Sequence, residues 1–168
     1  MAKKKKSKEE PKPKLLLVIR IRGNVHVNYK IEDTLKMLRL HKVNHGVILF
    51  SDKTIRGMLK KAKDYIAYGE INEDMLLYLL KRRAYLVGNT PLTEEHLKNE
   101  TNFKTVKELA KSLLKGKAKI KDIDKIKPIF RLHPPRGGFR GTIKKSYNSG
   151  GTLGNVGDYI NVMAKKMI

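Results

Sequence analysis

The residues of this chain best suited to chemistry lie in one interval that holds no carboxylate. Between Asp124 and Asp158 the sequence carries seven Lys and Arg side chains and seven of its 13 glycines. Lysine offers phosphate a point charge and arginine a planar fork, and glycine lets the main chain approach a crowded surface closely. The interval therefore predicts contact with an anionic scaffold such as the phosphate backbone of a nucleic acid.

The most informative part of this interval is PPRGGFRGTIKKSYNSGGTLGNVGD, which starts at Pro134. Its glycine patterns lack the preceding strand and the following Lys-Ser/Thr that a nucleotide-binding loop requires, so we interpret them as turns that let the main chain approach RNA. Two aromatic residues in the segment, Phe139 and Tyr147, could stack on bases or rest on the protein's own surface.

The whole chain also has an excess of basic over acidic residues. Its 168 residues include 38 Lys and Arg against 16 Asp and Glu, which gives a formal charge of +22. Self-repulsion on this scale destabilises a compact state unless a partner neutralises it, and nucleic acid is the partner we expect. An anionic membrane is the competing partner, but no apolar run approaches the roughly 20 residues of a spanning helix. No secretory signal pattern is visible, so we expect the protein to stay inside the cell.

Catalytic and metal-binding patterns are weak. The chain has no cysteine, which excludes disulfides and thiolate metal sites. His41 and His45 are four residues apart, a spacing that could bind metal on one helical face, but Asn44-His45-Gly46 is typical of a helix exit and no carboxylate completes a shell. No nucleophile with a plausible base emerges either. We therefore expect neither an enzyme nor a cofactor.

The elements that must position the basic residues begin after a tail. Residues 1–14 are rich in lysine and almost free of apolar side chains, so we predict a disordered tail that orders on phosphate or simply remains solvated. Residues 15–22 alternate as a strand, with one face in the core and the other ending in Arg20 and Arg22. Ile31, Leu35 and Leu38 then have helical spacing, and residues 46–50 read as a short buried strand.

The second half of the chain adds more helices and one strand. Ser51 or Asp52 can cap a helix whose apolar stripe ends at Ile66 and whose outer face is basic. Residues 70–123 carry half of the acids of the chain and are predicted to be a helical insertion, in which Thr105 and Glu108 form a capping box. Residues 126–133 alternate as a strand, and a last helix is predicted from Asp158 to Met167.

Taken together, these features resemble the L-thirty family of ribosomal proteins of the large subunit. The resemblance starts with residues 15–69, LLLVIRIRGNVHVNYKIEDTLKMLRLHKVNHGVILFSDKTIRGMLKKAKDYIAYG. Tyr65-Ile66-Ala67-Tyr68-Gly69, Pro135-Arg136-Gly137-Gly138, the stretch from Gly150-Gly151 to Gly154-Asn155 and the terminal basic-apolar helix narrow it to the archaeal and eukaryotic branch, whose eukaryotic member is called L-seven. The resemblance covers residues 15–168.

The resemblance implies an α+β fold, somewhat like ferredoxin. Its β-α-β-α-β core has a three-stranded antiparallel sheet with two helices on one face. The implied organisation is a tail (1–14), a core (15–69 with 124–135), a helical insertion (70–123) and a basic Gly-rich extension (136–168). The residue pattern alone does not choose between 126–133 and 84–88 as the third strand; the resemblance favours 126–133.

The family also implies which positions touch ribosomal RNA. The loop after the first strand, the start of the first helix and the second helix contribute Arg20, Arg22, His26, Lys30, Lys53, Arg56 and Lys60. The C-terminal extension contributes Arg136, Gly137, Gly138, Arg140, Lys144 and Lys145. For each cation the alternative is a charge that is merely solvated, and glycine enrichment with acid depletion favours contact for Arg136 and Arg140.

The sequence therefore predicts a structural constituent of the large ribosomal subunit in the cytoplasm. Its expected partners are large-subunit ribosomal RNA and neighbouring ribosomal proteins, with the small ribosomal RNA of that subunit as a further candidate. The alternatives are a free RNA-binding or RNA-chaperone protein and an enzyme that acts on RNA.

Overall fold

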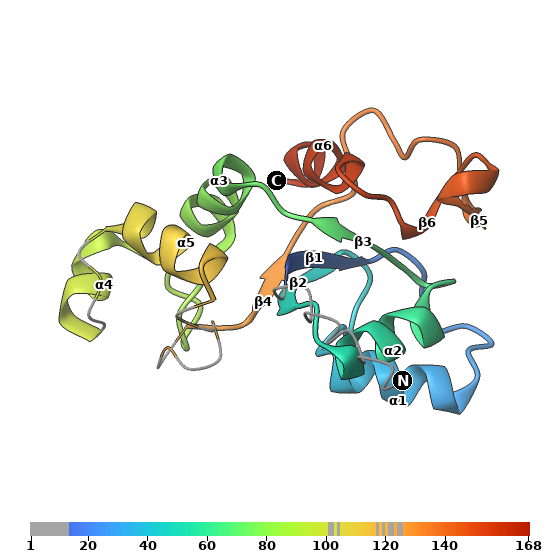
Figure 1. The fold of residues 1–168 in the computed structure, drawn as a ribbon, viewed down its shortest axis with the longest axis horizontal. Coiled ribbons are helices and arrows are strands. Elements are labelled where there is room, and N and C mark those ends of the chain that lie inside the picture. The colour runs from blue at the N-terminus through green and yellow to red at the C-terminus, as the bar shows by residue number, and fades with distance from the viewer. Residues whose placement is uncertain are drawn as a thin grey trace, which may run out of the picture.

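The structure is a computed structural model that describes residues 14–100, 103, 105–116, 118, 120, 123 and 126–168; for residues 98–100 it describes the main chain alone. The predicted disordered tail lies outside the described residues, except for Lys14. The fold is a mixed α+β arrangement in which one sheet lies between two groups of helices (Figure 1).

The sheet has six strands in the order β4-β2-β1-β3-β6-β5. Their bounds are β1 Leu15–Arg20, β2 His45–Phe50, β3 Ile66–Glu70, β4 Ile129–Arg131, β5 Thr142–Ser146 and β6 Gly151–Asn155. Strand β1 is antiparallel to both of its neighbours, and β2 is antiparallel to β4. Strand β6 runs parallel to β3 and to β5.

The helices begin at the polar residues that the sequence offers as caps. They are α1 Tyr29–Met37, α2 Lys53–Ala62, α3 Glu73–Arg83, α4 Glu94–Glu100, α5 Val106–Leu114 and α6 Tyr159–Met167, with a 3-10 turn η2 at Tyr147–Ser149. The Asn28 side chain accepts a hydrogen bond from the Lys30 N–H, and Thr105 accepts one from the Glu108 N–H, as the capping box predicts.

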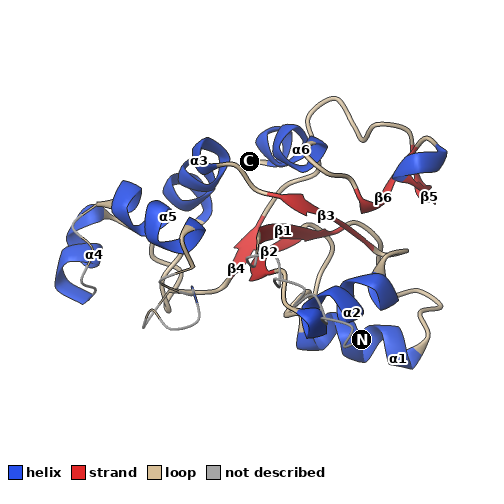
Figure 2. Cartoon of the chain, in the orientation of Figure 1, coloured by secondary structure: helices blue, strands red, loops and turns tan. Residues whose placement is uncertain are grey.

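The core has two parts because both faces of β1 are covered (Figure 2). Leu16 and Val18 pack with apolar residues of α1 and α2, whereas Leu17 and Ile19 face the other way. That second cluster joins the sheet to α3, α5 and α6. The expectation that one face of this strand ends in exposed basic residues is wrong at Arg20, whose side chain is buried.

The predicted three-stranded sheet is corrected to six strands, and the predicted third strand is corrected as well. The strand that follows α2 and pairs with β1 is β3, whereas residues 126–133 supply the three-residue β4 at the outer edge of β2. Ile66 falls four residues after Ala62, so the sequence pattern extended the helix where the chain already turns into a strand. The alternative segment 84–88 makes isolated bridges from Tyr85 and Leu86.

The C-terminal extension is part of the sheet rather than a flexible arm. Gly151 and Gly154 lie in β6, which corrects the expectation that these glycines are simply turns. A Cβ on Gly151 would overlap the Lys145 carbonyl of the neighbouring β5, so glycine is required there for the two strands to pack. Gly137 and Gly138, by contrast, have positive φ and open surroundings, as expected for an exposed turn.

Candidate nucleic-acid interface

Helix α2 presents three of the predicted RNA contacts on one side. Lys53, Arg56 and Lys60 are exposed, and their three- and four-residue spacings place them along one face of the helix. Arg56 Nε donates a 2.7 Å hydrogen bond to Ser51 Oγ, which orients the guanidinium and leaves its Nη groups available. Leu59 and Ala62 are buried and anchor the helix in the core.

The second group surrounds the loop after β1. The Arg22 guanidinium lies 4.9 Å from the centre of the Tyr65 ring and donates a 3.3 Å hydrogen bond to the Asp64 carbonyl. His26 is exposed with a positive φ of 54°, and Lys30 is exposed in the first turn of α1. These three side chains therefore lie at the surface, where phosphate can reach them.

Arg20 lies inside the protein. The residue is 1% exposed, and its guanidinium donates hydrogen bonds to the carbonyls of Arg22 (2.8 Å), Leu40 (2.8 Å) and His41 (3.3 Å) and to Asn24 Oδ1. Burial lowers the pKa of Arg20, whereas Glu32 and Tyr65 raise it. With its donors used by the protein, Arg20 is a structural side chain, and we remove it from the candidate interface.

The third group lies in the extension. Arg136, Lys144 and Lys145 are exposed, and every residue of β5 is exposed. The Arg140 guanidinium lies over the rings of Tyr147 and Tyr159, at 5.2 and 5.8 Å from their centres, and donates a 2.8 Å hydrogen bond to the Tyr147 hydroxyl. These contacts hold Arg140 in place beside the exposed strand.

The two aromatic residues of the extension rest on the protein. Phe139 and Tyr147 are half-buried against the large core cluster, and the Tyr147 ring stacks on Tyr159 with 5.8 Å between ring centres. Of the two possibilities open from sequence, the structure therefore favours packing on the protein's own surface.

The elements that carry most of these basic side chains lie toward one end of the molecule. In Figure 1, α1, α2, β5 and β6 occupy the right half along the longest axis, and α4 and α5 occupy the left end. The ion pairs found among the described residues are Lys14 with Glu70 and Lys36 with Glu32 and Asp33. In the part of the chain that the structure describes, Lys53, Lys60, Arg136, Lys144 and Lys145 have no carboxylate partner. The arrangement suits a partner that supplies negative charge.

Comparison with known proteins identifies the family. The sequence profile described as "Ribosomal protein L30p/L7e" matches residues 16–66, from β1 to the start of β3. The large ribosomal subunit protein uL30 of Archaeoglobus fulgidus is 49% identical over 150 residues, which cover 89% of this chain and 97% of the relative. The chain belongs to the uL30 family.

Other uL30 proteins of archaea give the same result. The protein of Methanococcus maripaludis is 49% identical over 152 residues, which cover 90% of this chain and 97% of the length of that relative. The protein of Methanocorpusculum labreanum is 43% identical over 150 residues, covering 89% and 97%. The aligned residues make up 89% of the chain, so the similarity to uL30 extends well beyond the profile match. It includes parts of the insertion and of the extension as well as the core.

The described part of this uL30 chain shows neither a group of metal ligands nor a membrane-spanning helix. His41 follows the end of α1 and His45 starts β2, so the two imidazoles do not share a helical face. Among the described residues no three His, Cys, Asp or Glu side chains are grouped as metal ligands would be. No helix in the described ranges has the length and apolar character needed to cross a membrane.

Sequence reasoning missed three residues that line a groove beside α2. Lys14, Tyr68 and Asn155 come from three separate segments, and the structure brings them next to Arg56 and Lys60. An alternation signal was available, because treating 66–70 as a strand places Tyr68 on the same face of the sheet as α2. The helical interpretation of Ile66 hid that signal.

Proposed function

We propose that this uL30 chain is a structural constituent of the large ribosomal subunit in the cytoplasm, that it binds large-subunit ribosomal RNA through phosphate and shape contacts, and that it supports subunit assembly and translation. The role is structural rather than catalytic and uses no cofactor. Family membership, with about half of the residues identical over 89% of the chain, carries the proposal. The cluster of exposed, unpaired cations at one end of the molecule supports it.

The proposed RNA-binding residues are the predicted ones without Arg20. They are Arg22, His26, Lys30, Lys53, Arg56, Lys60, Arg136, Gly137, Gly138, Arg140, Lys144 and Lys145. The insertion of 70–123 is less cationic, so its exposed side faces solvent or neighbouring ribosomal proteins in this proposal. The small ribosomal RNA of the large subunit is a possible further partner of the basic end.

Counterion release supplies much of the binding free energy in this proposal. Each phosphate that Lys or Arg neutralises releases condensed cations, so log K falls by about 0.7 to 0.9 for each tenfold rise in salt per contact. Affinity for a large-subunit RNA transcript is therefore expected to fall steeply between low and moderate salt. Nearly constant affinity over that range would contradict the account.

Co-sedimentation tests the assignment directly. A tagged copy of the full chain, expressed in an archaeal host, is followed through sucrose gradients at low and high salt. A subunit constituent stays with large subunits at high salt, because assembled RNA surrounds it. Release at high salt with recovery in the free fraction would instead favour a free RNA-binding or RNA-chaperone protein.

A further inference from the structure

A groove of about 790 Å³ lies between α2, the end of β3 and the turn that leads into α6. The residues that line it come from four parts of the chain and include apolar, cationic and amide side chains. Its walls include Lys14, Leu16, Arg56, Leu59, Lys60, Tyr68, Glu70, Asn155 and Asp158. A volume of this size can hold a small organic group of mixed polarity.

The floor of the groove is apolar. Leu16 and Leu59 are 8% and 1% exposed and belong to the core cluster beneath α1 and α2. The half-buried Tyr68 packs against the same cluster. Burial raises the pKa of Tyr68, so its hydroxyl stays protonated and can donate a hydrogen bond at neutral pH. A flat apolar group with polar edges fits such a floor.

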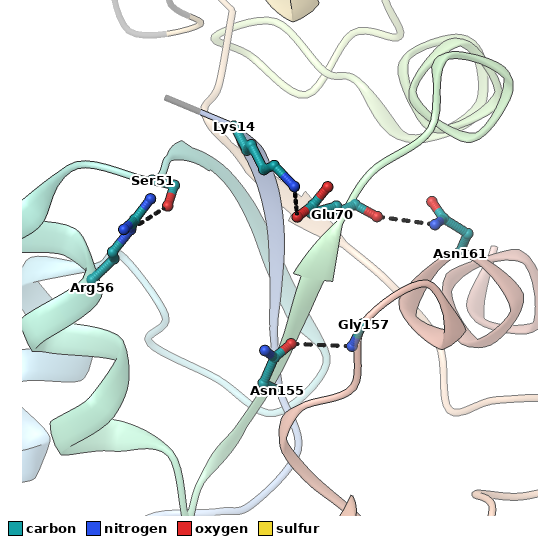
Figure 3. A network of polar contacts seen from close by, with 7 residues as sticks. All are labelled: Lys14, Ser51, Arg56, Glu70, Asn155, Gly157 and Asn161. Carbon is teal, nitrogen blue, oxygen red and sulfur yellow. Dashed lines mark hydrogen bonds and ion pairs between the residues drawn. The ribbon is translucent and has the colours of Figure 1, made fainter. Parts of the chain in front are cut away.

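The wall formed by α2 is cationic. Arg56 and Lys60 are four residues apart and project from the same face of the helix. The bond from Arg56 Nε to Ser51 Oγ holds the guanidinium in place (Figure 3). The Arg56 Nη groups and Lys60 Nζ have no partner in the described part of the chain. Two free cationic donors one helical turn apart suit a phosphate group.

The opposite wall offers hydrogen-bonding groups of both kinds. Asn155 Oδ1 accepts a 3.1 Å bond from the Gly157 N–H, so the Asn155 Nδ2 remains a free donor, and Figure 3 shows it pointing away from Gly157. The exposed Asp158 carboxylate is an acceptor. Glu70 is already paired with Lys14 at 2.6 Å, so its charge does not oppose an anion at the α2 wall.

This wall is held rigidly against β3. Asn161 Nδ2 donates a 3.0 Å bond to the Glu70 carbonyl, and Asn161 Oδ1 accepts a 3.0 Å bond from the Asn72 N–H. The Val156 N–H donates a 2.9 Å bond to the Tyr68 carbonyl. These bonds fix this wall against β3 before any ligand arrives, which reduces the ordering cost of binding.

We propose that the groove takes one unpaired nucleotide of RNA, with the base on the floor of Leu16, Leu59 and Tyr68 and a phosphate between Arg56 and Lys60. The edge of the base then meets Asn155 and Asp158, where an amide donor and a carboxylate acceptor can bind complementary groups. The inference rests on the proposed RNA-binding function and adds a specific pocket to it. A helix that contacts only duplex phosphates would need neither the apolar floor nor the opposite wall.

Photo-cross-linking tests the occupant. The full chain is bound to a transcript of archaeal large-subunit RNA, irradiated and digested, and nucleotide adducts are located by mass spectrometry. The expected result is an adduct on the tryptic peptide 64–81, localised to Tyr68. Adducts confined to other peptides, from a complex that forms normally, overturn the pocket while leaving the proposed function intact. Failure of any complex to form overturns both.

Binding of AMP to the full chain, followed by NMR, tests the orientation. Amide shifts of Tyr68 and Asn155 are expected with AMP, and Arg56→Gln or Lys60→Gln should each weaken AMP binding about five- to tenfold. Lys61→Gln is the matched control, because Lys61 is exposed on the same helix but does not line the groove. Equal losses in all three variants would overturn the proposal.

Chemical cross-linking in purified subunits tests the competing occupant. A neighbouring protein cross-linked through Lys60, together with an unmodified Tyr68 peptide, would assign the groove to a protein and overturn the nucleotide proposal. An RNA adduct on Tyr68 with no protein cross-link at Lys60 supports it.

Discussion

Arg20 Nη1 donates a 2.8 Å hydrogen bond to the carbonyl of Leu40, twenty residues further along the chain. The same side chain also binds the carbonyls of Arg22 and His41. It thereby joins the end of β1 to the turn between α1 and β2, and it supplies a donor to the buried Leu40 carbonyl.

Replacing Arg20 with methionine is expected to lower the free energy of unfolding by about 2 to 4 kcal/mol, because the buried Leu40 carbonyl and two part-buried carbonyls lose their donors at once. Urea unfolding of the two proteins measures this difference. Arg22→Met is the matched control, since Arg22 is partly exposed, and it should cost less than about 1 kcal/mol. Equal costs would contradict the structural role of Arg20.

Gly69 and Gly157 approach so closely that a Cβ on Gly69 would overlap the Gly157 carbonyl oxygen. Gly69→Ala should therefore force β3 and the turn before α6 apart and destabilise the fold by about 2 to 3 kcal/mol, as overpacking does. The midpoint of thermal or urea unfolding measures the cost.

Gly57→Ala is the same chemical change as Gly69→Ala, but it should raise the stability of the fold instead of lowering it. Gly57 lies within α2, and nothing stands within 4 Å of the Cβ that alanine would add. Alanine lowers the conformational entropy of the unfolded chain, so a gain of about 0.5 to 1 kcal/mol is expected. If both variants shifted stability in the same direction, close contact at Gly69 would not be the cause.

Local signals predicted the helices well. The Thr105 capping box, the Asn72 start of α3 and the apolar stripe of α2 each depend on residues within one or two turns, and the structure contains these helices. Strand pairing depends on residues far apart in sequence. Nothing in the spacing of 126–133 shows that this segment pairs with β2 at the edge, or that β6 pairs in parallel with β3.

The candidate site was predictable in part for the same reason. Charge and acid depletion pointed to Arg136, Lys144 and Lys145, which are exposed in the structure, and their contact with RNA stays a prediction. From its residue type and its place at the end of a strand, Arg20 cannot be told apart from an exposed arginine. Its side chain is buried because the turn near Leu40 folds over it. A sequence pattern records residue types along the chain, whereas burial depends on what the rest of the chain places above them.

The pH dependence of stability should include a contribution from His45. Burial lowers the pKa of His45, and the nearby charges of Arg131, His41, Lys42 and Arg20 lower it further. In the unfolded chain the imidazole takes up a proton near pH 6.5. Between that value and the lower folded pKa, the unfolded state holds more protons, so the free energy of unfolding falls as pH falls below about 6.5.

Urea unfolding at about pH 7.5 and about pH 5.5 measures this loss. In His45→Gln the free energy of unfolding should differ less between the two pH values than in the parent chain. The Lys42 N–H donates a 3.4 Å bond to His45 Nδ1, which a neutral imidazole can accept and a protonated one cannot. His26→Gln is the control, because His26 is exposed in the loop after β1. A pH dependence unchanged in His45→Gln would assign the effect to other groups.

Deleting whole segments cannot compare the RNA-binding roles of the insertion and the extension, because both contribute to the same apolar core. Charge substitutions on exposed residues avoid this problem. Replacing Arg136, Lys144 and Lys145 with glutamine removes three charges from the extension. Replacing Lys81, Arg82 and Lys111 removes three exposed charges from α3 and α5.

Filter binding to an archaeal large-subunit RNA transcript over a range of salt concentrations compares the two triple variants. If the extension contacts phosphate, its variant should reduce the salt slope of log K by about 2 to 3, because each of the three lost contacts accounts for about 0.7 to 0.9. The insertion variant has the same net charge but should keep a slope close to that of the parent chain. Equal slopes in the two variants would mean that total charge, rather than the basic end of the molecule, governs RNA binding.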